Sequence, residues 1–244
     1  MTDLSELKFF ATPPHECSYL ENEEATTLFV DPEAEINKDL YEQLSLVGFR
    51  RSGNHLYRPH CTSCSQCIPT RLLVDKFKPS KSQKRIIKRN NDLIYQQASN
   101  PLAMEYYDLY DKYLSQRHQD GDMYPPSFEQ YQTFLNSQWA DTHFFEARDS
   151  DGKLVSVLVC DLINSGFSAI YSFFDPELPK RSLGVMNVLW QVQLAKHNDL
   201  SYLYLGYWIR NCKKMSYKSN YQPLELYLDN EWVSYPQQVS IKNV

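Results

Sequence analysis

The sequence predicts an α+β protein in two parts, a smaller cysteine-containing part followed by a larger one. The chain has 244 residues, of which 42% are hydrophobic and 23% charged. This composition is typical of a globular protein and allows one large domain or two small ones. Helical and strand-like patterns alternate along the chain. The pattern breaks at Ser99-Asn100-Pro101, so we expect domains over residues 1–99 and 100–244.

The first part contains a few regular segments around an irregular, cysteine-rich stretch. Residues 39–49 predict a short amphipathic helix that ends at Gly48. Residues 71–74 predict a strand. Residues 80–94 predict a basic helix with Ser80 as its N-cap.

The second part is more regular. Ser127 and Ser182 precede helical patterns, and Asp149-Ser150-Asp151-Gly152 suits a hairpin turn. We expect helices over 101–118, 127–137, 182–197 and 212–219, and strands over 143–148, 154–162, 168–174, 202–206 and 224–228. Two helices, an antiparallel meander and then a β-α-β unit follow the order of the GNAT-like acyltransferase fold.

The sequence lacks the motifs that several classes of protein require, and those classes are therefore excluded. No GxxxxGK[ST] or GxGxxG motif occurs, so the common phosphate-binding loops are absent. No apolar run approaches the roughly 20 residues of a membrane-spanning helix, and the N-terminus does not resemble a secretory signal. We therefore expect no membrane partner, a reducing compartment, and six cysteines that serve as thiols or metal ligands.

Charge is distributed unevenly. The chain carries 25 Lys and Arg against 30 Asp and Glu, a net charge of −5. Residues 50–89 hold eleven lysines and arginines and one acidic residue, Asp75, which is a local balance of +10. The rest of the chain therefore carries −15. Such a basic block indicates a polyanionic partner in spite of the acidic total.

Three cysteines follow one another with two-residue spacers, and a fourth precedes them. They are Cys61, Cys64, Cys67 and Cys17. Four thiolates suit tetrahedral zinc or an iron–sulfur cluster, with His15 and His60 as possible substitute ligands. The alternative interpretation is a set of ordinary free thiols.

The basic helix places its cations on one face. Lys81, Lys84, Arg85, Lys88 and Arg89 follow the spacing i, i+3, i+4, i+7 and i+8. No acidic residue occurs between Lys76 and Asn91. We predict that this face binds a phosphate backbone, although a solvated surface helix is the alternative. Further arginines of the block extend the expected surface: Arg50, Arg51, Arg58 and Arg71.

The C-terminal half holds three more candidate segments. Residues 171–184 run from a strand into a helix N-terminus, which favours an anion or a developing oxyanion. Residues 202–225 interleave aromatic residues with cations. This pattern suits binding of the end of a nucleic acid, because bases stack on aromatic rings and phosphates pair with cations. The cations of residues 202–225 are Arg210, Lys213, Lys214 and Lys218. Residues 117–122 form a polar cluster that suits a solvated loop as well as a site.

Together these segments resemble the bacterial aspartate/glutamate leucyltransferases, which are relatives of the eukaryotic arginyl-tRNA–protein transferases. The resemblance covers essentially the whole chain. The matching segments are HECSYL at 15–20, GFRRSGNHLYRPHCTSCSQCIPTR at 48–71, FKPSKSQKRIIKRNNDL at 77–93, RHQDGDMYPPSF at 117–128, SFFDPELPKRSLG at 172–184 and YLYLGYWIRNCKKMSYKSNYQPLEL at 202–226. Where that family usually has arginines in the basic helix, this chain has Lys81, Lys84 and Lys88.

The resemblance implies a cytoplasmic aminoacyltransferase of the N-end rule pathway of protein degradation. Its donor would be Leu-tRNA, and its acceptors would be proteins with N-terminal Asp or Glu. The nucleophile, an α-amine with a pKa of about 7.7–8.0, is partly neutral at pH 7, and the donor is an activated ester. Positioning and oxyanion stabilisation should supply most of the rate, and the chemistry itself requires no cofactor.

Candidate site residues follow from this chemistry. Asp175 would accept the proton of the amine, although a turn residue before Pro176 is the alternative. Tyr207, Lys214 or Tyr217 would donate to the oxyanion or to the leaving ribose hydroxyl. The acidic side chain of the acceptor would be bound by Arg51, Arg58 and Arg117. The tRNA would be bound by Lys81, Lys84, Arg85, Lys88, Arg89, Arg210, Lys213 and Lys218, and a metal or cluster by Cys17, Cys61, Cys64 and Cys67.

Two other functions compete with this interpretation. An acyl-CoA-dependent N-acyltransferase of the same fold would need a glycine-rich loop for the pyrophosphate, but residues 180–184 contain one glycine. A non-enzymatic, metal-containing RNA-binding protein would leave the C-terminal half without a role.

Overall fold

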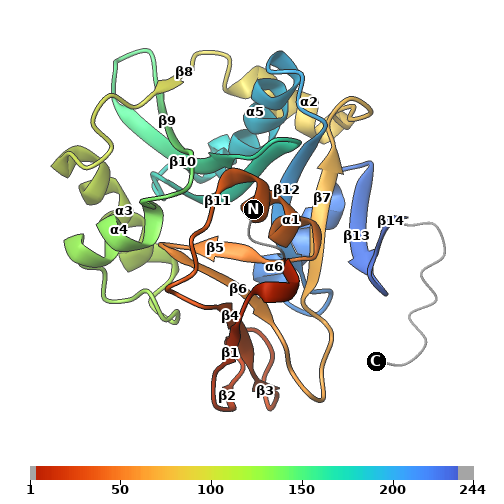
Figure 1. Cartoon of the computed structure of the whole chain (residues 1–244). Helices are drawn as coiled ribbons and strands as arrows, with labels where there is room; N and C mark the ends of the chain where they lie inside the picture. Colours follow the sequence, from red (N-terminus) through yellow and green to blue (C-terminus); the bar gives the residue numbers. More distant parts are fainter. Residues whose placement is uncertain (1–3, 236–244) are drawn as a thin grey trace.

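An eight-stranded mixed sheet forms the centre of the molecule in the computed structural model, which describes residues 4–235 (Figure 1). Its order is β14 (Glu231–Tyr235), β13 (Leu224–Leu228), β7 (Ile68–Leu73), β12 (Tyr202–Trp208), β11 (Gly166–Phe174), β10 (Leu154–Leu162), β9 (Thr142–Arg148) and β8 (Ile94–Gln97). The first predicted domain includes residues 1–3 and the second includes residues 236–244, and both of these ranges lie outside the described residues.

The only parallel pair of this described sheet is β11 with β12. Helix α5 (Leu183–His197) joins these two strands in a crossover connection, which parallel strands require. Three positions pair, and the last of them is Ser168 with Tyr204, although both strands continue further. Gly206 follows with a φ of +77°, at a register shift between β12 and β7. The sheet therefore opens between β11 and β12.

Different helices cover the two faces of the sheet. The remaining helices are α1 (Lys38–Leu46), α2 (Lys81–Arg89), α3 (Met104–Arg117), α4 (Phe128–Leu135) and α6 (Lys213–Ser216), with short 3₁₀ turns at Leu4–Glu6, Pro179–Arg181 and Tyr217–Asn220. Alternate residues of β10 divide between two cores. Leu158 packs in the core that α5 covers, whereas Val157 packs in the core formed with α3 and α4.

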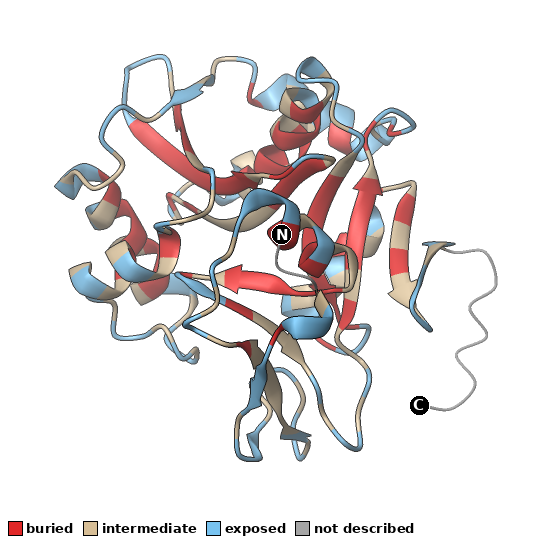
Figure 2. Ribbon diagram, viewed as in Figure 1, coloured by how far each residue is buried: buried red, intermediate tan, exposed pale blue. Residues whose placement is uncertain are grey.

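A smaller sheet lies beside the central one at the N-terminal end of the chain. Its order is β1 (Phe9–Ala11), β4 (Thr27–Val30), β6 (His55–Pro59) and β5 (Arg50–Ser52), and β2 (His15–Glu16) pairs with β3 (Glu24–Ala25). Figure 2 shows that the central strands are mostly buried, whereas the β1–β4 region is largely exposed or half-buried. No helix among residues 4–235 is long and apolar enough to span a bilayer.

The structure confirms the predicted α+β class and the predicted order of elements from α3 onward. The expected strand over 154–162 has the same bounds as β10. Ser80 is the N-cap of α2, as predicted, and it forms a capping box with Gln83. Ser182 also lies at a helix start, but it has a φ of 55° and makes no side-chain cap hydrogen bond.

Some boundaries predicted from the sequence were wrong. The basic helix ends at Arg89 and not at residue 94, because the Asn90 side chain donates to the Ile86 and Arg181 carbonyls. The chain then pairs with β9 as β8. The predicted strand over 71–74 overlaps the second half of β7, which ends at Leu73, and β14 was not predicted.

Both predicted domains contribute strands to the central sheet. Strand β7 pairs with β12 on one side and with β13 on the other. Strand β8 forms an edge of the same sheet. The parts before and after residue 100 are thus joined by backbone hydrogen bonds, and the boundary at 99/100 stays a prediction.

A buried ion pair ties the N-terminal sheet to the central one. Arg51 Nε of β5 lies 2.6 Å from Asp161 Oδ2 of β10, and both side chains are 0% exposed. Arg51 also donates to the carbonyls of Gly53 and Leu135. Tyr41 of α1 donates to Asp161 Oδ2 at 2.7 Å. Segments far apart in the sequence are therefore held at one point.

Replacing Arg51 with methionine should lower the free energy of unfolding by about 3–5 kcal/mol, because Asp161 would stay buried without its cation. Equilibrium urea unfolding at pH 7 measures this change. Lys38→Met is the control: its pair with Asp141 spans 3.9 Å with side chains 43% and 49% exposed. This control should change stability by less than about 1 kcal/mol. An equally small change in Arg51→Met would contradict the expectation.

Candidate functional site

Two adjoining pockets lie where the N-terminal sheet meets strand β12. Their volumes are about 440 Å³ and about 240 Å³, and Cys17, Cys61 and Cys67 line both. Tyr207 of β12 and Asp122 from the loop after α3 also line the larger pocket. Both parts of the chain therefore contribute to this site.

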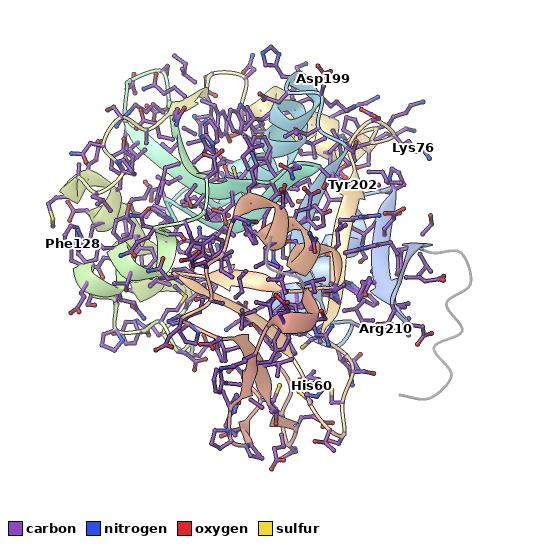
Figure 3. The ribbon with its side chains drawn as sticks, in the orientation of Figure 1. His60, Lys76, Phe128, Asp199, Tyr202 and Arg210 are labelled. Carbon is purple, nitrogen blue, oxygen red and sulfur yellow. The ribbon has the colours of Figure 1, made fainter. Side chains whose placement is uncertain are left out.

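The smaller pocket brings together the four cysteines that were predicted as ligands. Cys17, Cys61, Cys64 and Cys67 all line it, as does His60, which Figure 3 labels in the lower part of the molecule. The thiols are free and half-buried. Burial and the other three cysteines raise the pKa of Cys67 to about 12. Metal binding would require thiolates, so a bound cation would have to offset this raised pKa of Cys67.

The donor set fits zinc or an iron–sulfur cluster, but the side chains are not arranged around an ion. Among residues 4–235, no three His, Cys, Asp or Glu side chains form a group that could hold a metal ion as placed. Binding would require the thiols to close on a common centre. Glu23 and Glu24 line the same pocket and add negative charge.

One wall of the larger pocket is a face of the N-terminal sheet. Side chains that alternate along the strands lie on the same face. The pocket is lined in this way by Thr27 and Phe29 of β4, His55 and Tyr57 of β6, and Ser52 of β5. The wall is thus aromatic and polar, and it is held by backbone pairing.

Tyr207 forms part of the opposite wall. Its hydroxyl donates to the carbonyl of Gly48 at 2.9 Å and lies 3.2 Å from that of Tyr57. Burial raises the pKa of Tyr207 well above its ordinary value, so the phenol stays neutral. The predicted catalytic residue does lie at the site, but its proton is shared with main-chain oxygens.

The loop after α3 connects helix α6 to the larger pocket, which Asp122 of this loop lines. Lys214 Nζ pairs with Asp120 Oδ2 at 2.7 Å. Two residues further on, Asp122 accepts a hydrogen bond from Ser18 Oγ at 3.0 Å. Tyr217 is 42% exposed just beyond the helix. The polar cluster at 117–122 is therefore part of the site region.

Asp175 lies in a different environment from the one predicted for a general base. Its buried carboxylate pairs with Lys112 and Lys153, each at 2.8 Å. Burial alone would raise the pKa of Asp175, but hydrogen bonds from these lysines bring it below its usual value. A carboxylate held ionised by two cations is a weak proton acceptor. Its placement after β11 therefore favours a structural role.

The three arginines predicted to bind the acceptor differ in environment. The prediction for Arg51 was wrong, because this side chain is fully buried and its donors are used by Asp161 and by main-chain carbonyls. Arg58 is half-buried, lines the smaller pocket and donates to the Val47 carbonyl at 2.9 Å. Arg117 is exposed, with its guanidinium 5.3 Å from the centre of the Phe174 ring.

The cationic face of α2 is exposed as predicted. Lys81, Lys84, Arg85, Lys88 and Arg89 are all exposed. Arg89 donates to the Lys180 carbonyl, and no ion pair in the described part of the chain involves any of the five. Arg210 and Lys213 are exposed as well. Lys76 and Arg210 both lie along the right-hand side of Figure 3.

Lys218 disagrees with its predicted role in tRNA binding, because it is only 5% exposed. Its ammonium donates to the Tyr207 carbonyl at 2.5 Å and lies 3.0 Å from the Met215 sulfur. Burial and the nearby Arg50 guanidinium lower the pKa of Lys218 to about 7. The amine is therefore an internal group behind the Tyr207 wall.

Comparison with known proteins identifies the family. Residues 15–85 match the family described as arginine-tRNA-protein transferase, N terminus, and residues 105–228 match its C terminus. The chain is 56% identical over 232 residues to the aspartate/glutamate leucyltransferase of Alcanivorax borkumensis, covering 95% of this chain and 96% of that protein. The chain belongs to the aspartate/glutamate leucyltransferase family. It is therefore an aminoacyltransferase, as the resemblance implied.

Other relatives in the family agree. The enzyme of that name from Saccharophagus degradans is 50% identical over 235 residues, covering 96% of this chain and 100% of that protein. Among solved structures, FemX has a TM-score of 0.48 at 8% identity, over 86% of this chain and 81% of that one.

The sequence did not assign Arg50 or Asp122 to the acceptor site. Arg50 was assigned to the basic surface together with Arg51 and Arg71, but all three are buried. Arg71 pairs with Glu225 at 2.7 Å. The useful signal was strand alternation in β5, which places adjacent arginines on opposite faces.

Asp175→Asn should destabilise the protein at neutral pH but leave single-turnover transfer by the folded enzyme within about threefold. Because the folded-state pKa of Asp175 is lowered, its contribution is complete above its ordinary value of 3.8 and is lost as pH falls through the folded pKa. The gap in unfolding free energy between wild type and variant should therefore be constant from pH 8 to 5. A rate loss of about a hundredfold or more in folded variant would restore Asp175 as the base.

Proposed function

We propose that this protein transfers leucine from Leu-tRNA to the α-amino group of proteins that begin with Asp or Glu. The observation that carries the proposal is the near full-length match to enzymes of that name at 50–56% identity. The modified protein would then present a destabilising N-terminal residue, as expected for the N-end rule pathway.

The donor would be bound by the exposed cations and not by a coenzyme loop. The five cations of α2 form an unpaired positive face, to which Arg210 and Lys213 add charge. Such a face suits a phosphate backbone. The segment over 180–184, where α5 begins, has one glycine, Gly184, and a Cβ there would approach the Phe174 ring at 3.1 Å. That crowded helix start favours tRNA over acyl-CoA as donor.

The reaction is attack by a neutral α-amine on the ester carbonyl, followed by loss of the terminal ribose hydroxyl. The larger pocket supports the alignment of these groups. Asp122 supplies a carboxylate that suits the α-ammonium of the acceptor. Lys214, which pairs with Asp120 of the loop after α3, and the exposed Tyr217 are the proposed donors to the oxyanion or to the leaving hydroxyl. Tyr207 helps to shape the wall.

The four cysteines of the smaller pocket are proposed to hold zinc or an iron–sulfur cluster. Such a group would stabilise the loop over 61–67 beside the acceptor site and supply no step of the transfer. Metal analysis and the absorption spectrum of anaerobically purified protein distinguish the two. Protein that is fully active and equally stable with neither group would contradict the proposal.

Purified protein offered Leu-tRNA, Arg-tRNA or leucyl-CoA, with peptides that begin with Asp, Glu, Lys or Ala, tests the function. We expect product from Leu-tRNA with the Asp and Glu peptides alone. Product from leucyl-CoA would favour an acyl-CoA-dependent enzyme. Binding of tRNA without any product would favour a non-enzymatic RNA-binding protein.

Leu-tRNA binding should depend strongly on salt. With about five phosphate contacts, the slope of log K against log salt is expected to be roughly −3.5 to −4.5. The double variant Lys84→Gln/Arg85→Gln should make the slope shallower by about 1.4–1.8. Lys38→Gln on α1 is the control and should leave it unchanged. A wild-type slope near zero would remove the case for this surface.

A further inference from the structure

Arg50 is a buried cation with an unused hydrogen-bond donor. The residue is 7% exposed, and Nη2 donates to the Ala169 carbonyl. Nη1 is buried and has no hydrogen-bond partner, and no ion pair in the described residues involves Arg50. Its neighbour Arg51 differs, since it is fully paired with Asp161. A buried guanidinium without an anion is costly, so this site is suited to receive one.

Strand pairing determines where Arg50 points. In the β5–β6 ladder Arg50 lies opposite Tyr57, and Ser52 lies opposite His55. Residues directly opposite each other share a face of the sheet. Because Ser52, His55 and Tyr57 all line the larger pocket, Arg50 faces the same side; it lies near Tyr57 and Tyr207, behind the residues that line the pocket. Arg51 points the other way, toward Asp161.

The guanidinium also lies where the central sheet opens. Its acceptor, Ala169, comes directly after the last residue of β11 that pairs with β12. On the facing strand, Gly206 has no side chain, and a Cβ there would lie 3.6 Å from Arg50 Nε. The cation is therefore held between the two separating strands, close to the Tyr207 wall.

We propose that Arg50 binds the side-chain carboxylate of the acceptor's N-terminal Asp or Glu. This inference rests on the proposed function and names the residue that selects its substrate. A planar carboxylate matches the edge of a guanidinium. A buried group just behind a pocket wall can be reached only by the tip of a side chain, whereas a phosphodiester carries a ribose on each side. Asp122 in the same pocket complements the α-ammonium of the acceptor.

The surrounding charge supports an anion at this point. The Lys218 ammonium is buried nearby and interacts unfavourably with Arg50. Neither cation forms an ion pair within the described residues. A carboxylate between the wall and these two groups would relieve their repulsion. An N-terminal Asn or Gln of the same shape would not.

The test compares kcat/KM for isosteric peptides that begin with Asp or Asn, and with Glu or Gln. Wild type should prefer the acids by about a hundredfold or more, because a buried charge left unpaired penalises the amide. Arg50→Gln should reduce this ratio at least about tenfold, and Arg50→Lys should restore part of it. A purely structural role would lower both peptides equally and leave the ratio unchanged.

Arg58→Gln and Arg117→Gln are the matched variants, since each removes one arginine from the same region. Both should keep the acid-to-amide ratio of wild type. If Arg58→Gln or Arg117→Gln abolishes the ratio while folded Arg50→Gln keeps it, the proposal is overturned. Melting temperature and Leu-tRNA binding establish that each variant is folded.

A second measurement covers the case in which the Arg50 variants do not fold. A crystal structure of wild type with an Asp-starting peptide should place the carboxylate within hydrogen-bond distance of Arg50, and a carboxylate bound elsewhere would overturn the inference. If wild type gives no product with any peptide, the proposed transfer fails. Calorimetric titration of Asp-Ala against Asn-Ala would then still test Arg50.

Discussion

The buried pair of Arg51 with Asp161 is the contact on which the rest of the arrangement depends. It joins β5 to β10 in the protein interior, where the surrounding carbonyls use the other donors of the guanidinium. Because successive residues of a strand point to opposite faces, anchoring Arg51 inward fixes the direction of Arg50. The geometry of the pocket is therefore a consequence of a structural ion pair.

The molecule separates two kinds of positive charge. The cations of α2 are exposed and unpaired, so they attract a polyanion from a distance and lose strength with salt. Arg50 is buried, is little screened and can distinguish a carboxylate from an amide at contact distance. In the proposed function, surface charge would attract the RNA, and buried charge would recognise the acceptor. The acidic remainder of the chain would limit non-specific binding of polyanions elsewhere.

Local patterns predicted what depends on local sequence. The basic face of α2, the order of helices and strands, and the meeting of four cysteines were all readable, because periodicity and short spacing determine them. The roles of single charged residues were not. Asp175 forms ion pairs with Lys112 and Lys153 from other parts of the chain, and the Lys218 ammonium donates a hydrogen bond to the Tyr207 carbonyl. These environments are set by contacts between distant segments, which one sequence does not reveal.

The position of β7 has a consequence for how the chain is made. This strand is synthesised early, yet its two neighbours, β12 and β13, begin about 130 residues later or more. On the ribosome, β7 therefore emerges with both backbone edges unpaired, a state that invites pairing with other chains. The centre of the sheet closes only when the last strands arrive. The N-terminal part therefore stays incompletely paired until β12 and β13 have been synthesised.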